Sequence, residues 1–451
     1  MFMQMIDGTI VTTALPAITS DLRLSSQAQL LVVSGYSLAF ACTLLTAARI
    51  GELAGRRTMF LASVAAFTAA SLWCGMSSSA GELVAARVVQ GVAAAGMTAQ
   101  TIAIVAAGFP RDRHQQVFAV YGAVAGFAGM VGPILGGALV EADLFGSGWH
   151  AVFLINLPLG LLAFVLALRY LRPVRPRQRE RLDPAGVALS TLSVFALLYA
   201  LTDIQQYGWR IAPCLLIVAA AACALGFAAQ QRREARRGRS PMVRFDLFAD
   251  RRFAIGSLLV AMFFGLFTAF VFAISITLQD VLGFSPWRTG LLMTPFAVGA
   301  CAGALLSPIL VRRWGVAALA VAITVFGGCV AAGAVYLGVT GGAVCVPLVI
   351  GPVVLAGASV GAFSVPLQPI MLSGLRQRQM DAASGVLPTI EQLGNALGLV
   401  LLSALFFRAH TVPGSVTMFA AIAVVAFGAG ALTLALPYSA QRAGAPDSQA
   451  G

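Results

Sequence analysis

The sequence has little charge and few of the residues that soluble catalytic sites use. Only 10% of its 451 residues are charged, against roughly 25% in soluble domains. It contains no lysine, so all 29 basic residues are arginine. Its three histidines, at positions 114, 150 and 410, lie in separate loops without a nucleophile motif beside them. The sequence therefore predicts that the protein is not an enzyme.

The sequence also lacks the residue patterns of metal sites, disulfide frameworks and nucleotide-binding loops. The seven cysteines lie in apolar stretches and form no CxxC pair, which argues against a zinc or disulfide framework. No GxxxxGK[ST] phosphate-binding loop is evident, which argues against ATP-driven pumping. The longest polar loops are about twenty residues, too short for a separate soluble domain. We therefore expect no bound cofactor and no metal ion.

Apolar sequence is what the chain has in abundance. Hydrophobic residues make up 59% of it, and apolar stretches near the roughly 20 residues that cross a bilayer recur from end to end. Their Gly- and Ala-rich composition is typical of packed membrane helices rather than of barrel strands. The sequence predicts an all-α polytopic membrane protein with fourteen spans, centred near Ile10, Leu38, Val64, Ala94, Gly126, Leu161, Phe195, Val218, Phe264, Val298, Val325, Leu355, Leu397 and Val425.

The arginines indicate how these spans are oriented. If both termini are cytoplasmic, 24 of the 29 arginines fall on the cytoplasmic side, four fall on the other side, and Arg87 lies within a span. By the positive-inside rule, this asymmetry predicts a multi-pass protein of the cell membrane with both ends in the cytoplasm. The arginines are dispersed over short loops, which argues against a nucleic-acid-binding face as the reason for the net charge of +12.

Two polar stretches, residues 172–183 and 230–252, bracket a pair of helices and leave six spans before and six after it. Paired six-helix halves usually bind their substrate between them, near the middle of the bilayer. We predict an N-terminal six-helix bundle at 1–171, basic loops with the inserted helix pair at 172–252, a C-terminal six-helix bundle at 253–437 and a disordered cytoplasmic tail at 438–451.

Two motifs place charged residues in apolar surroundings. MIDGTIVTTALP (5–16) holds Asp7 in an almost chargeless run, and LVAARVVQ (83–90) places Arg87 inside the fourth span. Charged residues within membranes usually face a partner or a water-filled cavity, so both are candidates for proton or cation handling. Each also has a plainer interpretation: Asp7 as a local cap or pair near the surface, and Arg87 as a member of a structural ion pair.

Two further motifs concern backbone geometry. GFAGMVGPILGG (126–137) combines closely spaced glycines, which let helices touch, with a proline that bends the helix. It is either a hinge that biases which way a central cavity opens or only a packing motif, and its residues are Gly126, Gly129, Gly132, Pro133, Gly136 and Gly137. ARIGELAGRR (48–57), after the second span, is either a cytoplasmic gate or a loop that only fixes topology, and its residues include Glu52, Gly55, Arg56 and Arg57.

Together these blocks resemble the fourteen-helix, drug:proton antiporter branch of the major facilitator superfamily. MIDGTIVTTALP resembles the first-helix signature, ARIGELAGRR the loop motif after helix two, LVAARVVQGVAAAG the helix-four motif, and GMVGPILGG the helix-five antiporter motif. GWHAVFLINLPLG (148–160) looks like the entry to helix six. The resemblance covers nearly the whole chain and implies two six-helix bundles with two inserted helices, alternating access and proton-coupled efflux.

The sequence departs from the family pattern in places. Glu52 and Leu53 stand where the loop motif usually has Asp-Arg, so one arginine of the gating network is missing, and Thr12 stands where asparagine is common. Six residues precede Asp7, roughly 9 Å of helix, whereas family members usually have a longer lead. We expect the natural start to lie upstream of Met1, which mass spectrometry of the native N-terminus would test.

The C-terminal half offers a second membrane acid. In VLPTIEQLGNALG (386–398), Glu391, Asn395 and Gly398 lie at i, i+4 and i+7, on one face of a helix. The family resemblance assigns Glu391 no role. From its chemistry, Glu391 is the best candidate in this half for binding a proton or cation, and the alternative is a satisfied structural carboxylate.

The ninth span carries a stripe of phenylalanines, which attract apolar and cationic molecules or simply pack against lipid and neighbouring helices. With polar and aromatic residues of other spans they give the candidates for a substrate cavity: Tyr36, Gln90, Gln100, Phe127, Phe263, Phe267, Phe270 and Asn395.

From these observations we predict a monomeric exporter of amphipathic or cationic small molecules that is driven by the proton gradient. Its partners would be the substrate, protons and the lipid bilayer. Asp7, Glu391 and Arg87 would handle the proton or cation. Dedicated export of one natural product fits the same motifs, uptake by symport fits them less well, and a non-transporting membrane sensor is the alternative from a different class.

Overall fold

Every regular element in the described part of the chain is a helix, which confirms the all-α prediction. The computed structural model describes residues 2–108, 124, 128, 131–143, 146–171, 183–207, 210–237, 243, 245–372, 386–395, 397–398, 400–402 and 411–437. The predicted hinge residues Gly126 and Gly129, the cavity candidate Phe127 and the predicted tail 438–451 lie outside these residues.

In the described part of its first half, the chain has four long helices and several shorter helical segments. Ser25 caps the second of them by accepting a hydrogen bond from the backbone N–H of Ala28. The elements are α1 (Phe2–Leu22), α2 (Ser26–Ala54), α3 (Arg56–Met76), α4 (Ala80–Gly108), the helix Val131–Ala142, the 3-10 turn η3 (Gly148–His150), α6 (Ala151–Leu154) and α7 (Asn156–Tyr170).

The second half repeats this pattern after an inserted helix pair. Asp250 caps α10, and Ser285 followed by a proline begins α11, so local chemistry sets these starts. The elements are α8 (Pro184–Tyr207), α9 (Ile211–Arg236), η4 (Phe245–Ala249), α10 (Arg251–Ile276) with a π-helical end η5 (Thr277–Val281), α11 (Pro286–Trp314), α12 (Val316–Thr340), α13 (Val346–Leu372), the helix Val386–Leu402 and α15 (Val412–Leu434).

The described helices agree with the predicted membrane spans. Among the residues that the structure describes, ten helical segments are long and apolar enough to cross a membrane, and Val131–Ala142 and Val386–Leu402 are shorter apolar helices. Helices α1 and α4 are 21 and 29 residues long, which is also enough to cross a membrane. They carry buried polar side chains such as those of Asp7 and Arg87. Each predicted span centre lies in one of these helices, apart from Gly126, which the structure does not describe.

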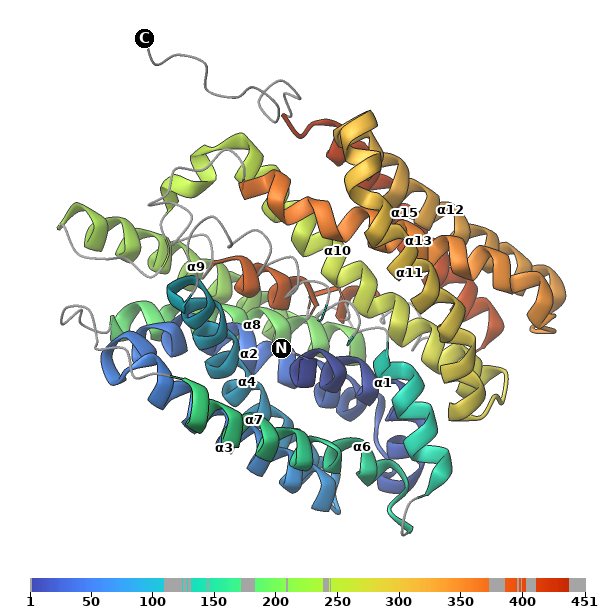
Figure 1. Ribbon diagram of the computed structural model, residues 1–451, viewed down its shortest axis with the longest axis horizontal. Coiled ribbons are helices and arrows are strands. Elements are labelled where there is room, and N and C mark those ends of the chain that lie inside the picture. Colours follow the sequence, from blue (N-terminus) through green and yellow to red (C-terminus); the bar gives the residue numbers. More distant parts are fainter. Residues whose placement is uncertain are drawn as a thin grey trace.

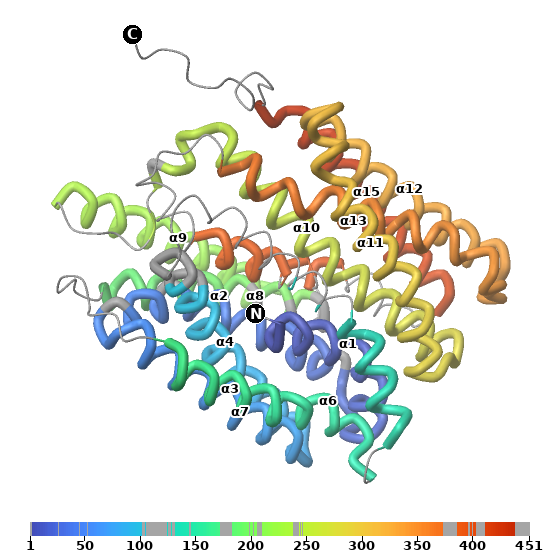
Figure 2. The backbone as a smooth tube through the Cα atoms, in the orientation of Figure 1, coloured from blue at the N-terminus to red at the C-terminus, as the bar shows by residue number. Residues whose placement is uncertain are grey.

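The helices gather in two groups (Figure 1). Helices α1 to α7 lie on one side and α10 to α15 on the other, while α8 packs on α2 and on α9. Figure 2 traces α1 from the middle of the molecule, where it contacts α10 and α11 of the second group as well as α2 and α7 of its own. The outer faces carry large apolar side chains such as Leu305 and Val339, which are 79% and 82% exposed, as a lipid-facing surface requires.

Glycines bring the helix Val131–Ala142 close to both groups. A Cβ atom added at Gly136 would lie 2.9 Å from the carbonyl oxygen of Ile10 in α1, and one added at Gly137 would overlap the carbonyl of Pro286 in α11. A Cβ at Gly290 would lie 2.9 Å from the carbonyl oxygen of Pro133. The motif therefore forms close backbone contacts both within the first group and between the groups.

A cavity of about 510 Å³ lies between α2 and α8. Its lining is almost entirely apolar and includes none of the residues that the sequence singled out, because it is formed by Thr46, Pro184, Val187, Ala188, Thr191 and Leu192. This cavity therefore marks the junction of the inserted pair with the first group rather than the predicted site.

Candidate functional site

Asp7 is fully buried in α1, which is surrounded by other helices. The apolar residues Ile6, Ile10 and Val11 around it are 0–1% exposed, so α1 lies inside the protein rather than against lipid. A charged side chain in this position has neither water nor lipid headgroups to solvate it and needs partners from neighbouring helices.

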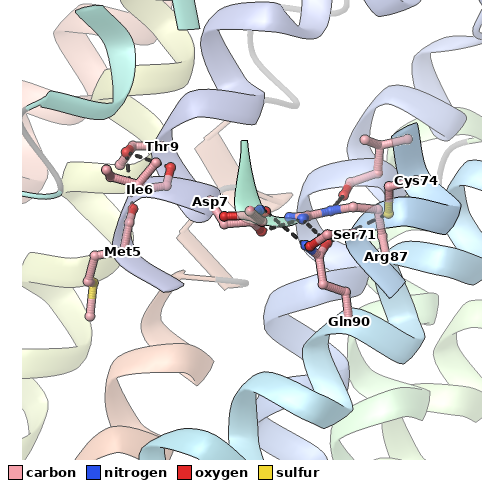
Figure 3. Close-up of polar contacts among 10 residues, drawn as sticks. Met5, Ile6, Asp7, Thr9, Ser71, Cys74, Arg87 and Gln90 are labelled. Carbon is pink, nitrogen blue, oxygen red and sulfur yellow. Dashed lines mark hydrogen bonds and ion pairs between the residues drawn. The ribbon is translucent and has the colours of Figure 1, made fainter. Parts of the chain in front are cut away.

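The carboxylate of Asp7 has three donors from two other helices (Figure 3). Its Oδ2 accepts a hydrogen bond from Nη1 of Arg87 at 2.5 Å. Its Oδ1 accepts from Nε2 of Gln90 at 2.8 Å and from Nδ2 of Asn156 at 3.0 Å. All four side chains are 0–1% exposed. The partners belong to α4 and α7, so Asp7 is not a local cap of its own helix.

Arg87 also has partners of its own. Its Nε donates to the carbonyl oxygen of Val32 at 3.1 Å, and its Nη1 donates to Oε1 of Gln90 at 2.6 Å. The guanidinium carbon lies 4.4 Å from the ring centroid of Tyr36 and 5.8 Å from that of Phe153. Carbonyl oxygens and aromatic faces both stabilise a cation, so the guanidinium is held even without the carboxylate.

Helix α3 supplies the outer contacts of this cluster. Nε2 of Gln90 donates to Oγ of Ser71 at 2.7 Å, and Sγ of Cys74 lies 3.7 Å from Oε1 of Gln90. The sequence motifs indicated Asp7, Arg87 and Gln90 but not Ser71, Cys74 or Asn156. Asn156 lies in the block GWHAVFLINLPLG, so the sequence carried a signal for it in a motif that resembles the family.

The polar cavity candidates of the first group lie in contacts between helices. Tyr36 is 4% exposed and faces the guanidinium of Arg87. Gln100 is 1% exposed, and its Nε2 donates to the carbonyl oxygen of Ala47 at 2.9 Å. One turn before Asp7, Gln4 binds the carbonyl of Ala94 in the same manner at 2.5 Å. Polar side chains of this kind hold membrane helices together.

The loop between α2 and α3 has the turn that the sequence predicts. Gly55 has a φ of +95°, which a residue with a side chain rarely adopts, and it separates the two helices. Nη2 of Arg57 donates to the carbonyl oxygen of Leu168 at 2.8 Å, near the end of α7. Arg56 is half-buried at the first position of α3, and the side chain of Glu52 lies outside the described residues.

In the second group, Glu391 is 9% exposed and its Oε1 accepts a hydrogen bond from Nε2 of Gln368 in α13 at 2.6 Å. Oδ1 of Asn395 accepts from Oγ1 of Thr268 in α10 at 2.7 Å. The helix face that carries Glu391 and Asn395 therefore points toward α10 and α13. Gly398, which is predicted to lie on the same face, is in close contact with the backbone of α10.

The phenylalanine stripe of α10 packs against three other helices. The ring of Phe263 lies 5.4 Å from that of Phe363 in α13, and the ring of Phe270 lies 5.2 Å from that of Phe326 in α12. Phe267 stacks on Phe263 at 6.1 Å and on Phe296 of α11 at 6.4 Å. The stripe thus forms an aromatic layer in the core of the second group.

Helices α1 and α10 are joined by side chains of α10 and its π-helical end that donate hydrogen bonds to backbone carbonyls of α1. Pro16 has no N–H, so the carbonyl of Thr12 lacks the partner that a helix normally supplies. Oγ of Ser275 donates to this carbonyl oxygen at 2.7 Å, and Nε2 of Gln279 donates to that of Thr13 at 3.0 Å. These residues, called the α1–α10 junction below, connect the two groups.

Comparisons with known proteins agree with this architecture. The profile of the family described as "Major Facilitator Superfamily" matches residues 1–399. The "Probable actinorhodin transporter" of Streptomyces coelicolor is 34% identical over 411 residues, which cover 90% of this chain and 70% of that protein. The "Multidrug resistance protein Stp" of Mycobacterium tuberculosis is 29% identical over 408 residues, which cover 90% of this chain and 73% of that protein.

A solved structure shares the fold. The crystal structure of an auto inhibited POT family peptide transporter aligns with 100% of this chain and 97% of its own, with a TM-score of 0.66 and 16% sequence identity.

Proposed function

The chain belongs to the Major Facilitator Superfamily and is a polytopic membrane transporter, and on this premise we propose that it exports amphipathic small molecules in exchange for protons. Asp7 is the carboxylate that takes up and releases the proton. The observation that carries this proposal is the fully buried cluster of Asp7, Arg87, Gln90 and Asn156. The names of its relatives support export of antibiotics or drugs.

In this proposal, proton movement is coupled to transport because a proton and Arg87 compete for the carboxylate of Asp7. In a low dielectric the charged form of Asp7 persists because Arg87 pairs with it. A proton on Oδ2 removes that charge and releases the pair. The guanidinium still contacts the carbonyl of Val32, the amide oxygen of Gln90 and the ring of Tyr36. These groups stabilise its charge when the ion pair breaks. Asp7 can then move relative to α4 as the protein changes conformation.

The proton gradient supplies enough energy for concentrative export. Each charge moved across the membrane gains about 2.3 kcal/mol per 100 mV. At roughly 150 mV, one proton therefore sustains a substrate gradient of a few hundredfold. The protein needs no bound cofactor on this account, and a monomer is sufficient.

We place both termini in the cytoplasm, which the arginine distribution supports. In this orientation the α1–α10 junction and the contacts of Gly137 and Pro133 with α11 lie toward the outer side. Glu52, Arg56 and Arg57 act on the cytoplasmic side. Opening to the outside then requires the glycine-rich helix Val131–Ala142 to part from α11, which gives Gly132, Pro133, Gly136 and Gly137 the role of a hinge.

Dedicated export of one natural product is the second candidate function. The 34% identity to a protein named for actinorhodin transport favours it. A broad exporter moves many chemically unrelated compounds, whereas a dedicated one moves a single compound class. Transport measured with single aromatic polyketides and with unrelated lipophilic drugs separates the two functions.

Proton movement in liposomes tests the proposal. Purified protein is placed in vesicles with an acidic interior that contain a pH dye, and a panel of lipophilic cations and neutral drugs is added outside. We expect a drug-dependent rise of internal pH as protons leave and the drug enters, and its loss in Asp7→Asn. A wild-type response from folded Asp7→Asn protein would refute the role of Asp7.

A further inference from the structure

The cavity between α2 and α8 lies where the inserted helix pair meets the first group (Figure 1). It measures about 510 Å³ and is lined by Thr46 of α2 and by residues of the first turns of α8. The inserted pair is largely surrounded by lipid, because only 12% of the apolar part of α8 is buried inside the protein. Leu192, which lines the cavity, is 54% exposed. The cavity therefore opens to the membrane rather than to the interior of the protein.

The face of α2 that borders this cavity changes from apolar to charged along its length. Cys42, Thr46 and Arg49 lie at i, i+4 and i+7, on one face of the helix. Sγ of Cys42 lies 3.9 Å from the carbonyl oxygen of Thr191, so α2 and α8 come together at this end. Arg49 is half-buried one turn beyond Thr46, about 4.5 Å along the helix axis. The cavity thus has a closed apolar end and a cationic end.

Thr46 adds a hydrogen-bond donor between these two ends. Its hydroxyl oxygen is buried and has no hydrogen-bond partner among the described residues. A threonine in a helix divides between two side-chain rotamers, so rotation about one bond turns this hydroxyl toward the cavity that the residue lines. A bound molecule with a carbonyl oxygen at this height would satisfy the donor.

The charges near the cationic end favour an anion. In the orientation proposed above, α2 ends and α8 begins on the cytoplasmic side, and residues 172–181, which precede α8 in the sequence, contain five arginines and one glutamate. Asp183 is an acid next to the first lining residue, but its carboxylate has donors of its own. Its Oδ1 accepts from the backbone N–H of Gly186 and its Oδ2 from Nε2 of Gln231 in α9, both at 2.9 Å. Basic segments at the cytoplasmic surface attract anionic lipids.

We propose that the cavity between α2 and α8 binds an anionic phospholipid of the cytoplasmic leaflet. One acyl chain fills the apolar cavity, an ester carbonyl accepts a hydrogen bond from Thr46, and the phosphate lies at Arg49. The order of these three groups along α2 is the order of phosphate, ester and chain in a phospholipid. The site is separate from Asp7 and goes beyond the proposed export function, and only the choice of leaflet rests on the proposed orientation.

Native mass spectrometry of delipidated protein, titrated with lipid, tests the charge preference of this site. The probes are dioleoylphosphatidylglycerol, which is anionic, and dioleoylphosphatidylcholine, which has the same chains and no net charge. We expect the first bound lipid to be retained at lower concentrations of the anionic probe. Arg49→Gln should weaken binding of the anionic lipid by roughly 5-fold, the contribution of one arginine beside an anionic headgroup. Arg312→Gln, which removes an exposed arginine at the end of α11, is the matched control and should change nothing.

Variants that fill the cavity test its place in the protein. Ala188→Trp puts a large side chain into the cavity and should abolish retention of the first lipid of either kind. Ala224→Trp changes an equally exposed alanine of the inserted pair that does not line the cavity, and it should bind as wild type does. Val187→Phe narrows the same cavity and gives a second variant. A thermal melt without lipid shows that each variant is folded.

Three outcomes would overturn the proposal. Equal retention of both lipids by wild-type protein would show that the cavity takes any acyl chain without regard to charge. Equal effects of Arg49→Gln and Arg312→Gln would contradict the placement of the phosphate at Arg49. Wild-type retention in both Ala188→Trp and Val187→Phe would place the bound lipid elsewhere on the protein. These measurements involve no proton movement, so their failure is distinct from a failure of the proposed export function.

Discussion

At the scale of single residues, the pair of Asp7 and Arg87 is asymmetric. Arg87 retains a carbonyl oxygen, an amide oxygen and two aromatic faces when Asp7 loses its charge. Among the described residues, Asp7 without Arg87 retains the amides of Gln90 and Asn156 as its side-chain partners. The acid therefore depends on the arginine more than the arginine depends on the acid.

Substitution of Arg87 should reveal this dependence. Arg87→Met leaves a buried carboxylate without its counter-ion, which typically costs about 3–5 kcal/mol, so we expect a clearly lower melting temperature in detergent. The double variant Asp7→Asn with Arg87→Met removes both charges and should recover most of the loss. Equal melting temperatures for the single and double variants would show that the pair does not stabilise the fold in this way.

Part of this cluster could be predicted from the sequence. Asp7, Arg87 and Gln90 were found because charged and amide side chains are conspicuous within apolar runs. Ser71 and Cys74 carry no such signal, since small polar residues are common throughout these helices. Their role depends on which face of α3 meets α4, and that packing is a property of the tertiary structure.

At the scale of elements, the α1–α10 junction joins the two groups through the backbone of α1. The junction depends on Pro16, which frees the carbonyl of Thr12 for Ser275. It also depends on the π-helical end of α10, which carries Gln279. Because these bonds cross between the groups, they must break if the two groups part at this end of α1.

Weakening the junction should favour the outward-open conformation. We expect Ser275→Ala with Gln279→Leu to increase labelling of a Gly8→Cys reporter by a membrane-impermeant maleimide added outside, in a background without the native cysteines. A side chain fits at Gly8 because a Cβ atom added there would have no other atom within 4 Å beyond its own helix backbone.

Thr277→Val is the matched control for that experiment. It removes a hydrogen bond of similar length, 3.0 Å to Oγ of Ser415, from the same end of α10. This bond lies within the second group, so its loss should leave labelling unchanged. Equal labelling of the junction variant and the control would contradict a gating role for the junction.

The positions of the helices were largely predictable from the sequence, whereas the irregular segment at the contact between the two groups was not. Length and apolar composition located the helices because a membrane-spanning helix must satisfy its own backbone and face lipid. The turn at Gly55 followed from the glycine in the loop motif. The π-helical segment Thr277–Val281 has no comparable sequence signal, since it depends on how α10 packs against its neighbours.

At the scale of the whole molecule, the two groups of helices carry different buried charges. The first group holds a neutralised pair, and the second holds the carboxylate of Glu391. On the proposed export function, movement of the groups relative to one another changes the access of protons to Asp7.

The most direct test of the account separates transport from coupling in Asp7→Asn. In liposomes, exchange of labelled substrate against unlabelled substrate needs the conformational cycle but no net proton movement, whereas accumulation against a gradient needs the proton. We predict that Asp7→Asn exchanges substrate at the wild-type rate and does not accumulate it when a proton gradient is imposed. Accumulation equal to that of wild-type protein would contradict the central claim that Asp7 couples the proton to export.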